Sequence, residues 1–336
     1  MSQLRTVLLT LATLAVLGAV AGFATVLFGL FNTSARTGHW AVTDWAMHTT
    51  FENAVALRAP PEEDVPDDLS DPALVELGAR HYDSACAMCH ATPGTSAGAT
   101  IAAMVPPPPQ IDQAVKPWSA AEMHWIVDAG VKMTGMPAWP AAGREDEVWA
   151  VVAFLTAVQH GMTPDDYAEL TAPAAEGYCA SCHGAGGTSR APRLDILTPD
   201  YIADQLAAYR SGARPSGMMA HAAAKVPASG DAELAEAIAR LEGPKQAAPN
   251  DPAAGEALAA RGIAQIPACL TCHGPDNQNP RIPSLDGQGE AYLADQLALW
   301  RDGVRGGAER APLMVAAAKG LSDADIAVLS AFFAAR

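Results

Sequence analysis

The longest apolar run of the chain lies at its start. Residues 6–31 carry no charged side chain and are rich in Leu, Val and Ala. A run of this length can cross a lipid bilayer as a helix. A cleaved signal peptide is the alternative, because 19–21 (Ala-Val-Ala) resembles a cleavage site. The apolar run continues ten residues beyond that point, however, and signal-peptide cores are usually shorter. The pattern therefore predicts an uncleaved N-terminal transmembrane anchor over residues 1–31.

The next segment, residues 32–70, is more polar. Trp40 and Trp45 follow the apolar run closely, as tryptophans at a membrane–water interface do. The stretch 60–68 is rich in Pro and acidic residues, which predicts an extended, solvated linker. We therefore expect a juxtamembrane segment that ends in an acidic linker.

The rest of the chain has the hydrophobic pattern of helices. Residues 119–122 and 321–326 each contain a capping box, which is typical of a helix start. Val148, Val152 and Leu155 fall on one face of a helix. No stretch shows the sustained alternation that predicts a strand. The fold class predicted is all-α.

An internal repeat divides this helical part. Residues 200–214 match 291–305 at an offset of 91 residues, which indicates two duplicated units. We predict three domains, 71–165, 166–245 and 246–336, of which the first lacks the repeated stretch. Each is marginal on its own hydrophobic core, so another group is expected to fill its centre.

The net charge of the chain is −16. This charge argues against a nucleic-acid partner, because phosphate binding needs a basic surface. It favours solubility of an exported domain and steering toward partners with basic patches.

All six cysteines occur in three copies of one pattern, C-x-x-C-H. A zinc site or a redox disulfide uses cysteine pairs too, but neither needs a histidine directly after the second cysteine. With nine histidines among 336 residues, chance supplies that histidine three times running only about once in 50,000 cases. The copies are Cys86, Cys89 and His90; Cys179, Cys182 and His183; and Cys269, Cys272 and His273.

This pattern is the attachment signature of c-type haem. Two thiols three residues apart on a helical turn reach the two vinyl groups of one porphyrin edge, and the histidine then binds the iron. The sequence predicts three covalently bound c-type haems. Because such attachment takes place on the oxidising, exported side of a membrane, we expect a single-pass protein of the bacterial inner membrane with its haem domains in the periplasm.

The sixth iron ligand decides what each haem does. Methionine opposite histidine gives a closed, electron-transferring iron, whereas an open position permits gas or peroxide chemistry. Met314 is the single methionine of the third block. In the second block Met218 and Met219 compete, and the register of the repeat favours Met219. In the first block Met136 is favoured over Met133.

Two sets of neighbours are candidates for supporting roles. Prolines follow each attachment motif at 106–109, Pro192 and Pro283, and a carbonyl there can accept a hydrogen bond from the haem-binding histidine; a simple loop role is the alternative. Arg210 and Arg301 are candidates to pair with haem propionates, or else lie on the surface.

These residues resemble the class I cytochrome c family. The first block resembles mono-haem domains of membrane-anchored respiratory cytochromes, through "YDSACAMCH", "PPPPQI", "GVKMTGMPAW" and "EVWAVVAFL". The other two resemble tandem dihaem periplasmic cytochromes, through "CASCHG", "CLTCHG", the shared "ADQL" and the late Met219 and Met314. The resemblance implies His/Met iron in every domain. One departure is 226–234, which replaces the capped helix start of the third block.

Together these features predict an electron carrier without catalytic residues of its own. It would relay electrons in a respiratory chain, from a quinol-oxidising complex to a terminal oxidase or another acceptor. One alternative is the cytochrome c subunit of a periplasmic dehydrogenase complex. Another is a haem peroxidase-type enzyme, which needs one readily opened iron.

Overall fold

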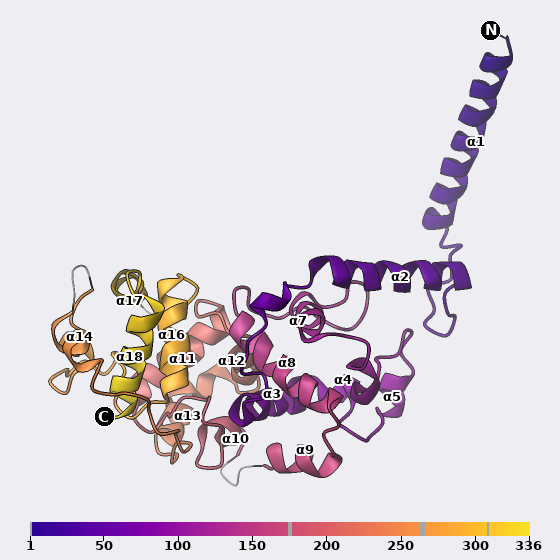
Figure 1. Cartoon of the computed structure of the whole chain (residues 1–336). Coiled ribbons are helices and arrows are strands. Elements are labelled where there is room, and N and C mark those ends of the chain that lie inside the picture. The colour runs from indigo at the N-terminus through magenta and orange to yellow at the C-terminus, as the bar shows by residue number, and fades with distance from the viewer. Residues whose placement is uncertain (1, 174–176, 263–265, 308) are drawn as a thin grey trace.

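The computed structural model describes residues 2–173, 177–262, 266–307 and 309–336. Within these ranges the chain is helical and contains no strand, which confirms the all-α prediction (Figure 1). The helices of the three predicted blocks follow one another across the body, with the second block between the first and the third (Figure 1).

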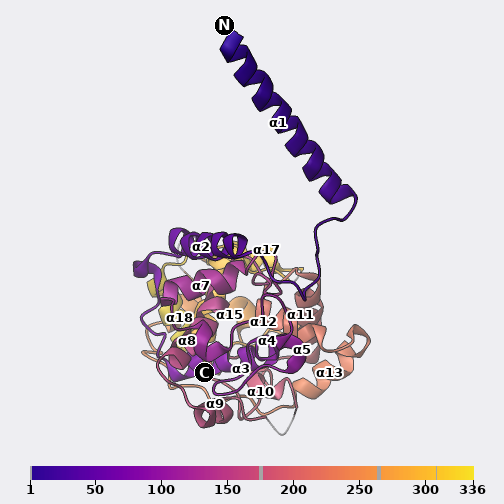
Figure 2. The ribbon, with the colours of Figure 1, turned by 90° about the vertical axis from the view of Figure 1, so that its right-hand side faces the viewer.

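The N-terminal helix α1, Ser2–Leu27, stands apart from the body in both views (Figure 1, Figure 2). Its part Gln3–Leu27 is long and apolar enough to cross a membrane, by length and composition, and none of it is buried within the protein. The predicted apolar helix is therefore present. A signal sequence near an N-terminus has the same properties, so the choice between anchor and signal stays a prediction.

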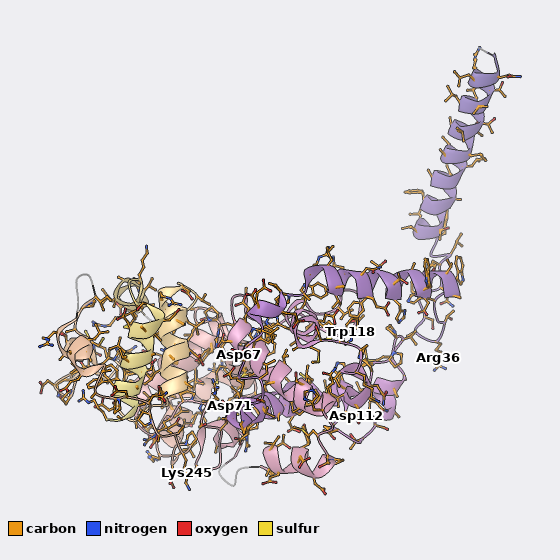
Figure 3. The ribbon with its side chains drawn as sticks, viewed as in Figure 1. Arg36, Asp67, Asp71, Asp112, Trp118 and Lys245 are labelled. Atoms are coloured by element: carbon orange, nitrogen blue, oxygen red, sulfur yellow. The ribbon has the colours of Figure 1, made fainter. Side chains whose placement is uncertain are left out.

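A second helix, α2, Ala41–Arg58, occupies part of the segment expected to be juxtamembrane. Its C-terminal half packs on the first block through Val55, which is fully buried, and through an edge-to-face contact of 5.6 Å between the rings of Phe51 and Trp118 (Figure 3). Its N-terminal half is exposed, with Trp45 66% accessible. Sequence periodicity did not predict this helix, because its buried positions are few and confined to one half.

The acidic stretch that follows α2 is less extended than predicted. It forms one 3₁₀ turn, η1, Glu62–Asp64. Asp68 and Asp71 then pair with Arg190 of the second block, at 2.8 and 2.5 Å. Figure 3 places Asp67 and Asp71 in the middle of the body. The acidic stretch is thus mostly exposed, as predicted, and is tied to the second block at its C-terminal end by Asp68; the linker limits stay a prediction.

In the first block, α3 (Pro72–Ala85) is capped by Asp71, whose side chain accepts a hydrogen bond from the Ala73 amide. This helix crosses α8 (Glu145–Gln159), and Tyr82 and Phe154 pack in the core between them. The capping box predicted at 119–122 is present at the start of α7. The helices of this block are α3 Pro72–Ala85, α4 Ala87–His90, α5 Ala99–Ala102, α6 Ile111–Ala114, α7 Ala120–Ala129, α8 Glu145–Gln159 and α9 Pro164–Leu170.

The second and third blocks have smaller cores of their own. Ile202, Leu206 and Ile238 belong to one cluster, and Leu293 and Leu329 belong to the other. The second capping box, at Ser322 and Asp325, is also present. The remaining helices are α10 Ala180–His183, α11 Pro199–Ser211, α12 Gly217–Ala224, η2 Ala228–Gly230, α13 Asp231–Ile238, α14 Glu256–Arg261, α15 Leu270–His273, α16 Glu290–Arg301, α17 Ala311–Ala318 and α18 Asp323–Ala334.

The exact domain limits stay a prediction. The expected boundary between 165 and 166 falls inside α9, and Tyr167 of that helix packs in the core of the first block. Its hydroxyl donates to Asp83 on α3 at 2.8 Å.

The crossing of α3 and α8 depends on Gly78. A Cβ atom there would lie 1.9 Å from the carbonyl oxygen of Ala150, so the helices would have to separate. Although Ala is the better helix residue by about 1 kcal/mol, we expect Gly78→Ala to lower the free energy of unfolding by about 1–3 kcal/mol. Urea unfolding measures the loss. Gly98→Ala is the control, because nothing lies within 4 Å of a Cβ there; equal stability of the two variants would contradict the prediction.

Candidate haem attachment sites

Each of the three C-x-x-C-H patterns forms a single helical turn. The turns are α4, α10 and α15, and the first cysteine stands at the start of each. The histidine amide donates to the carbonyl of that first cysteine, at 3.0 Å for His90, 3.0 Å for His183 and 2.9 Å for His273. This i to i+4 bond brings the two thiols of each motif onto one side of the turn. None of the six cysteines is paired in a disulfide.

The side chain of each motif histidine is oriented by a proline carbonyl. The Nδ1 atom of His90 lies 2.9 Å from the carbonyl oxygen of Pro109, and that of His183 lies 2.9 Å from Pro192. The same bond joins His273 to Pro283 at 3.0 Å. With Nδ1 as the donor, Nε2 keeps its lone pair for a metal. The proposed supporting role of the prolines is confirmed as a hydrogen bond in all three motifs.

A cavity of about 470 Å³ adjoins the second motif. Both thiols of the motif, His183, Pro192 and Met219 line it. The volume is that of a site for a cofactor-sized ligand, and the lining offers two thioether-forming groups, an imidazole and a sulfur. These residues fit a covalently bound haem. In the described part of the chain no three His, Cys, Asp or Glu side chains gather as ligands of a metal ion, so the zinc alternative has no ligand set there.

Burial favours the neutral form of several attachment residues by shifting their pKa values. It raises the pKa of the Cys86 thiol to about 11, with a further rise from the neighbouring Cys89. Burial also lowers the pKa of His183 and His273, and the bonds from their proline carbonyls oppose that change. Neutral imidazole is the form that binds a metal.

Comparison with known proteins agrees with this geometry. Residues 73–155 match the family model "Cytochrome C oxidase, cbb3-type, subunit III". A "Thiosulfate dehydrogenase electron acceptor" of Thiomonas intermedia is 36% identical over 177 residues, which are 49% of this chain and 81% of that protein. The chain belongs to the cytochrome c family. It is a c-type cytochrome, an electron carrier with covalently bound haem.

Two further relatives are cytochromes c4. That of Pseudomonas aeruginosa is 34% identical over 170 residues, or 46% of this chain and 81% of the relative. The solved structure of cytochrome c4 from Acidithiobacillus ferrooxidans is 29% identical and covers 47% of this chain and 98% of its own, with a TM-score of 0.42.

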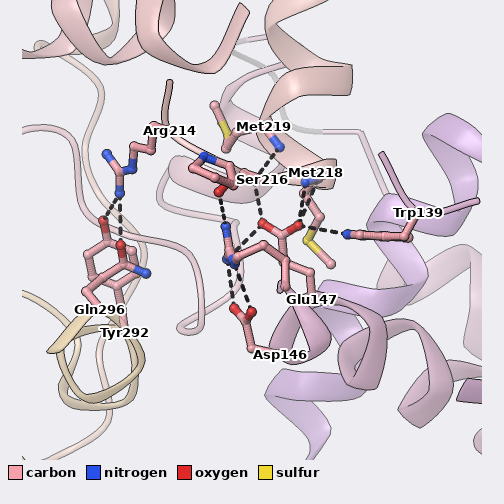
Figure 4. A network of polar contacts seen from close by, with 12 residues as sticks. Trp139, Asp146, Glu147, Arg214, Ser216, Met218, Met219, Tyr292 and Gln296 are labelled. Atoms are coloured by element: carbon pink, nitrogen blue, oxygen red, sulfur yellow. Dashed lines mark hydrogen bonds and ion pairs between the residues drawn. The ribbon is translucent and has the colours of Figure 1, made fainter. Parts of the chain in front are cut away.

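The candidate axial methionines of this cytochrome lie in different settings. Met218 packs against the core of the first block, whereas the next residue, Met219, points away from it (Figure 4). Met314 lies on α17 against the third core. Met133 is 91% exposed with a positive φ, and Met136 is partly buried. Met218 and Met219 both line the cavity of the second motif, so Met219 is favoured only because its side chain is directed away from the first core. Partial burial favours Met136 over Met133, and the assignments stay proposals.

The two arginines that were candidates to pair with haem propionates, Arg210 and Arg301, each bind carboxylates of the protein, and a propionate contact stays a prediction. Arg210 pairs with Asp231 and donates to the carbonyl of Ala223 at 3.0 Å. Arg301 pairs with Asp302 at 3.0 Å and with Asp323 at 2.6 Å. Asp231 and Asp323 lie 21 and 22 positions further along the chain, so each guanidinium is paired within its own block.

A different pair of arginines, not singled out from the sequence, joins the second and third blocks: Arg214 is buried and Arg305 is partly buried. Arg214 donates to Tyr292 at 3.2 Å and to Gln296 at 2.9 Å. Arg305 donates to Tyr201 at 3.1 Å. Arg214 and Arg305 occupy matching positions of the repeat, as do Tyr201 and Tyr292, so each arginine reaches the tyrosine of the other unit. The repeat was the available signal, but it does not say which copies face each other.

His81 lines the cavity at the second motif. The centre of its ring lies 5.1 Å from that of Trp139 and 5.8 Å from that of His221. Burial lowers its pKa to about 4, and His221 adds to that effect. Unfolded chains take up a proton at histidine below about pH 6.5, which the folded protein does not do until about pH 4. Stability from His81 is therefore complete above pH 6.5 and falls as the pH drops toward 4.

We expect the free energy of unfolding of His81→Gln to fall less between pH 6.5 and pH 4 than that of the wild type. The pKa shift, from 6.5 to about 4, corresponds to a change on the order of 3 kcal/mol in unfolding free energy. Urea unfolding between pH 4 and 7 measures it, with the exposed His160→Gln as the control. Parallel profiles for wild type and His81→Gln would contradict the expectation.

Proposed function

We propose that this cytochrome holds three haems and passes electrons along them in series. One haem would be bound at each C-x-x-C-H turn, with His90 and Met136, His183 and Met219, and His273 and Met314 as iron ligands. The observation that carries the proposal is the threefold recurrence of one geometry, a thiol pair on a turn whose histidine is held by a proline carbonyl. The three domains proposed are 71–165, 166–245 and 246–336.

The position of the cavity at the second motif supports electron transfer through all three blocks. Arg80 and His81 of the first block line it from one side, and Tyr292 and Gln296 of the third block from the other. A group bound there is thus in contact with both neighbours, and short distances favour electron transfer.

The side chains of the protein support electron transfer by holding the haem and its ligands, and take no part in a reaction of their own. Bound haem supplies a one-electron iron couple. The proline carbonyls keep each imidazole in one orientation, so little rearrangement accompanies a change of charge. Met136, Met219 and Met314 as ligands would keep other ligands from the iron and would raise its potential. The enclosing side chains exclude water, which has the same effect on potential.

For the cellular role, we propose a protein tethered to the inner membrane by α1 with its haem domains in the periplasm. The apolar length of α1 supports the tether. A quinol-oxidising complex would supply electrons, and a terminal oxidase or another acceptor would receive them. The net charge of −16 supports docking to partners with basic surfaces.

A second candidate is the cytochrome subunit of a periplasmic dehydrogenase complex. It is favoured by the relative described as a thiosulfate dehydrogenase electron acceptor, of which this chain covers 81%. In this case the electrons would come from a soluble substrate through a partner subunit.

Purification from membranes tests the proposal. A pyridine haemochrome assay is expected to give three haems per chain, and a count below three would refute the series. Co-purification with a quinol-oxidising complex favours the respiratory relay, whereas a stable dehydrogenase partner favours the second candidate. Carbon monoxide added to the reduced protein is expected to leave the spectrum unchanged, and binding at any haem would favour an enzyme.

A further inference from the structure

Glu147 is a buried carboxylate of the first block that bonds to the second block. It lies on α8 and is 7% exposed. Its oxygens accept hydrogen bonds from the Gly217 amide at 2.6 Å, from the Met218 amide at 3.3 Å and from the hydroxyl of Ser216 (Figure 4). The indole of Trp139 adds a fourth bond at 3.2 Å.

Except for the Trp139 indole, these donors belong to the start of helix α12. Gly217 and Met218 are its first two residues, and their amides have no partner within the helix. Ser216 is the N-cap and accepts from the Met219 amide at 2.9 Å. A carboxylate also stabilises the positive end of a helix. We call these contacts the Glu147 cap, because a residue 70 positions earlier completes the capping of α12.

Arg144 balances the charge of this cap. It lies 2.9 Å from Glu147 and 2.7 Å from Asp146, and it donates to the carbonyl of Pro215 at 2.6 Å. Burial raises the pKa of Glu147, and Arg144 limits that rise. Since buried charges are stable only when paired, the pair lets an ionised carboxylate remain at the helix start.

Close packing holds the same end of α12 on the first block. A Cβ atom at Gly217 would lie 2.4 Å from the indole of Trp139, so only glycine permits this approach. Met218 packs into the core of the first block. Met219 lines the cavity that contains His183, as Met218 also does in part, and its side chain is directed away from the first core (Figure 4). The first block therefore fixes the helix turn from which the candidate ligand projects.

The corresponding helix of the third block has no such cap in the described part of the chain. Met314 lies on α17, which begins after Arg310 without a hydrogen bond from a capping side chain. Both the second and the third block thus carry a helix with a candidate methionine. In the described residues, only the helix of the second block is capped by a side chain of a neighbouring block.

We propose that Glu147 is a positioning residue through which the first block holds Met219 on the iron of the second block. This inference rests on the proposed function, because it needs a haem at Cys179 and Cys182 with Met219 as its ligand. Without the cap, the first turn of α12 would loosen, and the iron–sulfur bond of that haem alone would open more readily.

The test compares Glu147→Gln with Glu145→Gln in the full-length protein with its haems. Glu145 is exposed in the first turn of the same helix, so its variant makes the same charge change away from α12. Imidazole displaces methionine from oxidised iron and removes the weak far-red absorption band of a His/Met haem. We expect Glu147→Gln to lose one third of that band at an imidazole concentration about tenfold lower than wild type requires. Glu145→Gln is expected to follow wild type.

Met219→His assigns the effect to the second block. Alone, it is expected to remove one third of the far-red band, and Glu147→Gln added to it is expected to change nothing further. An effect of Glu147→Gln that persists in this background overturns the inference, because it then acts on another haem. A Glu147→Gln titration equal to that of Glu145→Gln also overturns it. A full band in Met219→His refutes Met219 as a ligand, which is a failure of the proposed function itself.

Ser216→Ala is the second variant if Glu147→Gln does not assemble with its haems. It removes the N-cap hydroxyl and leaves the pair of Arg144 and Glu147 in place. A smaller shift confined to the same third of the band supports the inference, and a wild-type titration overturns it.

Discussion

Replacing Cys179 and Cys182 together with alanine is expected to leave a chain with two haems and an unfolded second block. The cavity at this motif measures about 470 Å³, and the apolar cluster of the second block, with Ile202, Leu206 and Ile238, forms part of its lining. Without haem, this small cluster loses the apolar group that it packs against. Mass spectrometry is expected to show the loss of one haem, and far-UV circular dichroism a loss of helix.

The matched control for this variant is Ser181→Ala. Ser181 lies between the two cysteines, and its hydroxyl donates to the carbonyl of Tyr178 at 2.7 Å. Its removal leaves both thiols and His183 in place, so three haems and wild-type helicity are expected. Two results for the double-cysteine variant would contradict the role assigned to this cavity. One is a mass that still corresponds to three haems, and the other is wild-type helicity in a chain with two haems.

Met314→His is expected to lower the reduction potential of one haem and leave the other two unchanged. Axial ligands span roughly 0.8 V across haem proteins, and histidine in place of methionine lowers the potential, so a drop on the order of 0.1 V or more is expected. Potentiometric titration of the haem absorbance measures it. The third block offers a clear case because Met314 is its single methionine.

The control for the potential is Met123→Leu. Met123 is buried in the core of the first block, where a methionine acts as packing. Its replacement is expected to leave all three potentials in place. Three unaltered potentials in Met314→His as well would exclude Met314 as an iron ligand.

The arrangement of the blocks bears on how potentials are set in this cytochrome. The second block is bound on one side by Glu147 and Arg144, and on the other by the crossed bonds of Arg214 to Tyr292 and Arg305 to Tyr201. Its cavity is lined from both sides. Changes in either neighbour are therefore expected to reach the middle site first.

The amino-acid sequence by itself determined the chemistry of this protein. The attachment motifs and the capping boxes at 119–122 and 321–326 depend on residues within one or two helical turns, so the spacing of residue types was sufficient to predict their geometry. The apolar run that forms α1 was predictable for the same reason. The proline carbonyls lie 19, 9 and 10 positions after their histidines, and the recurrence of a proline after each motif was the signal that predicted them.

Only the tertiary structure decided how the blocks meet. The Glu147 cap joins residues about 70 positions apart, and Arg214 reaches Tyr292 across 78 positions. The residues around Glu147 and Arg214 in the sequence contain no feature that predicts these distant partners. Their contacts depend on which surfaces of the blocks are buried together. That choice is made by packing, which periodicity and motif spacing do not encode.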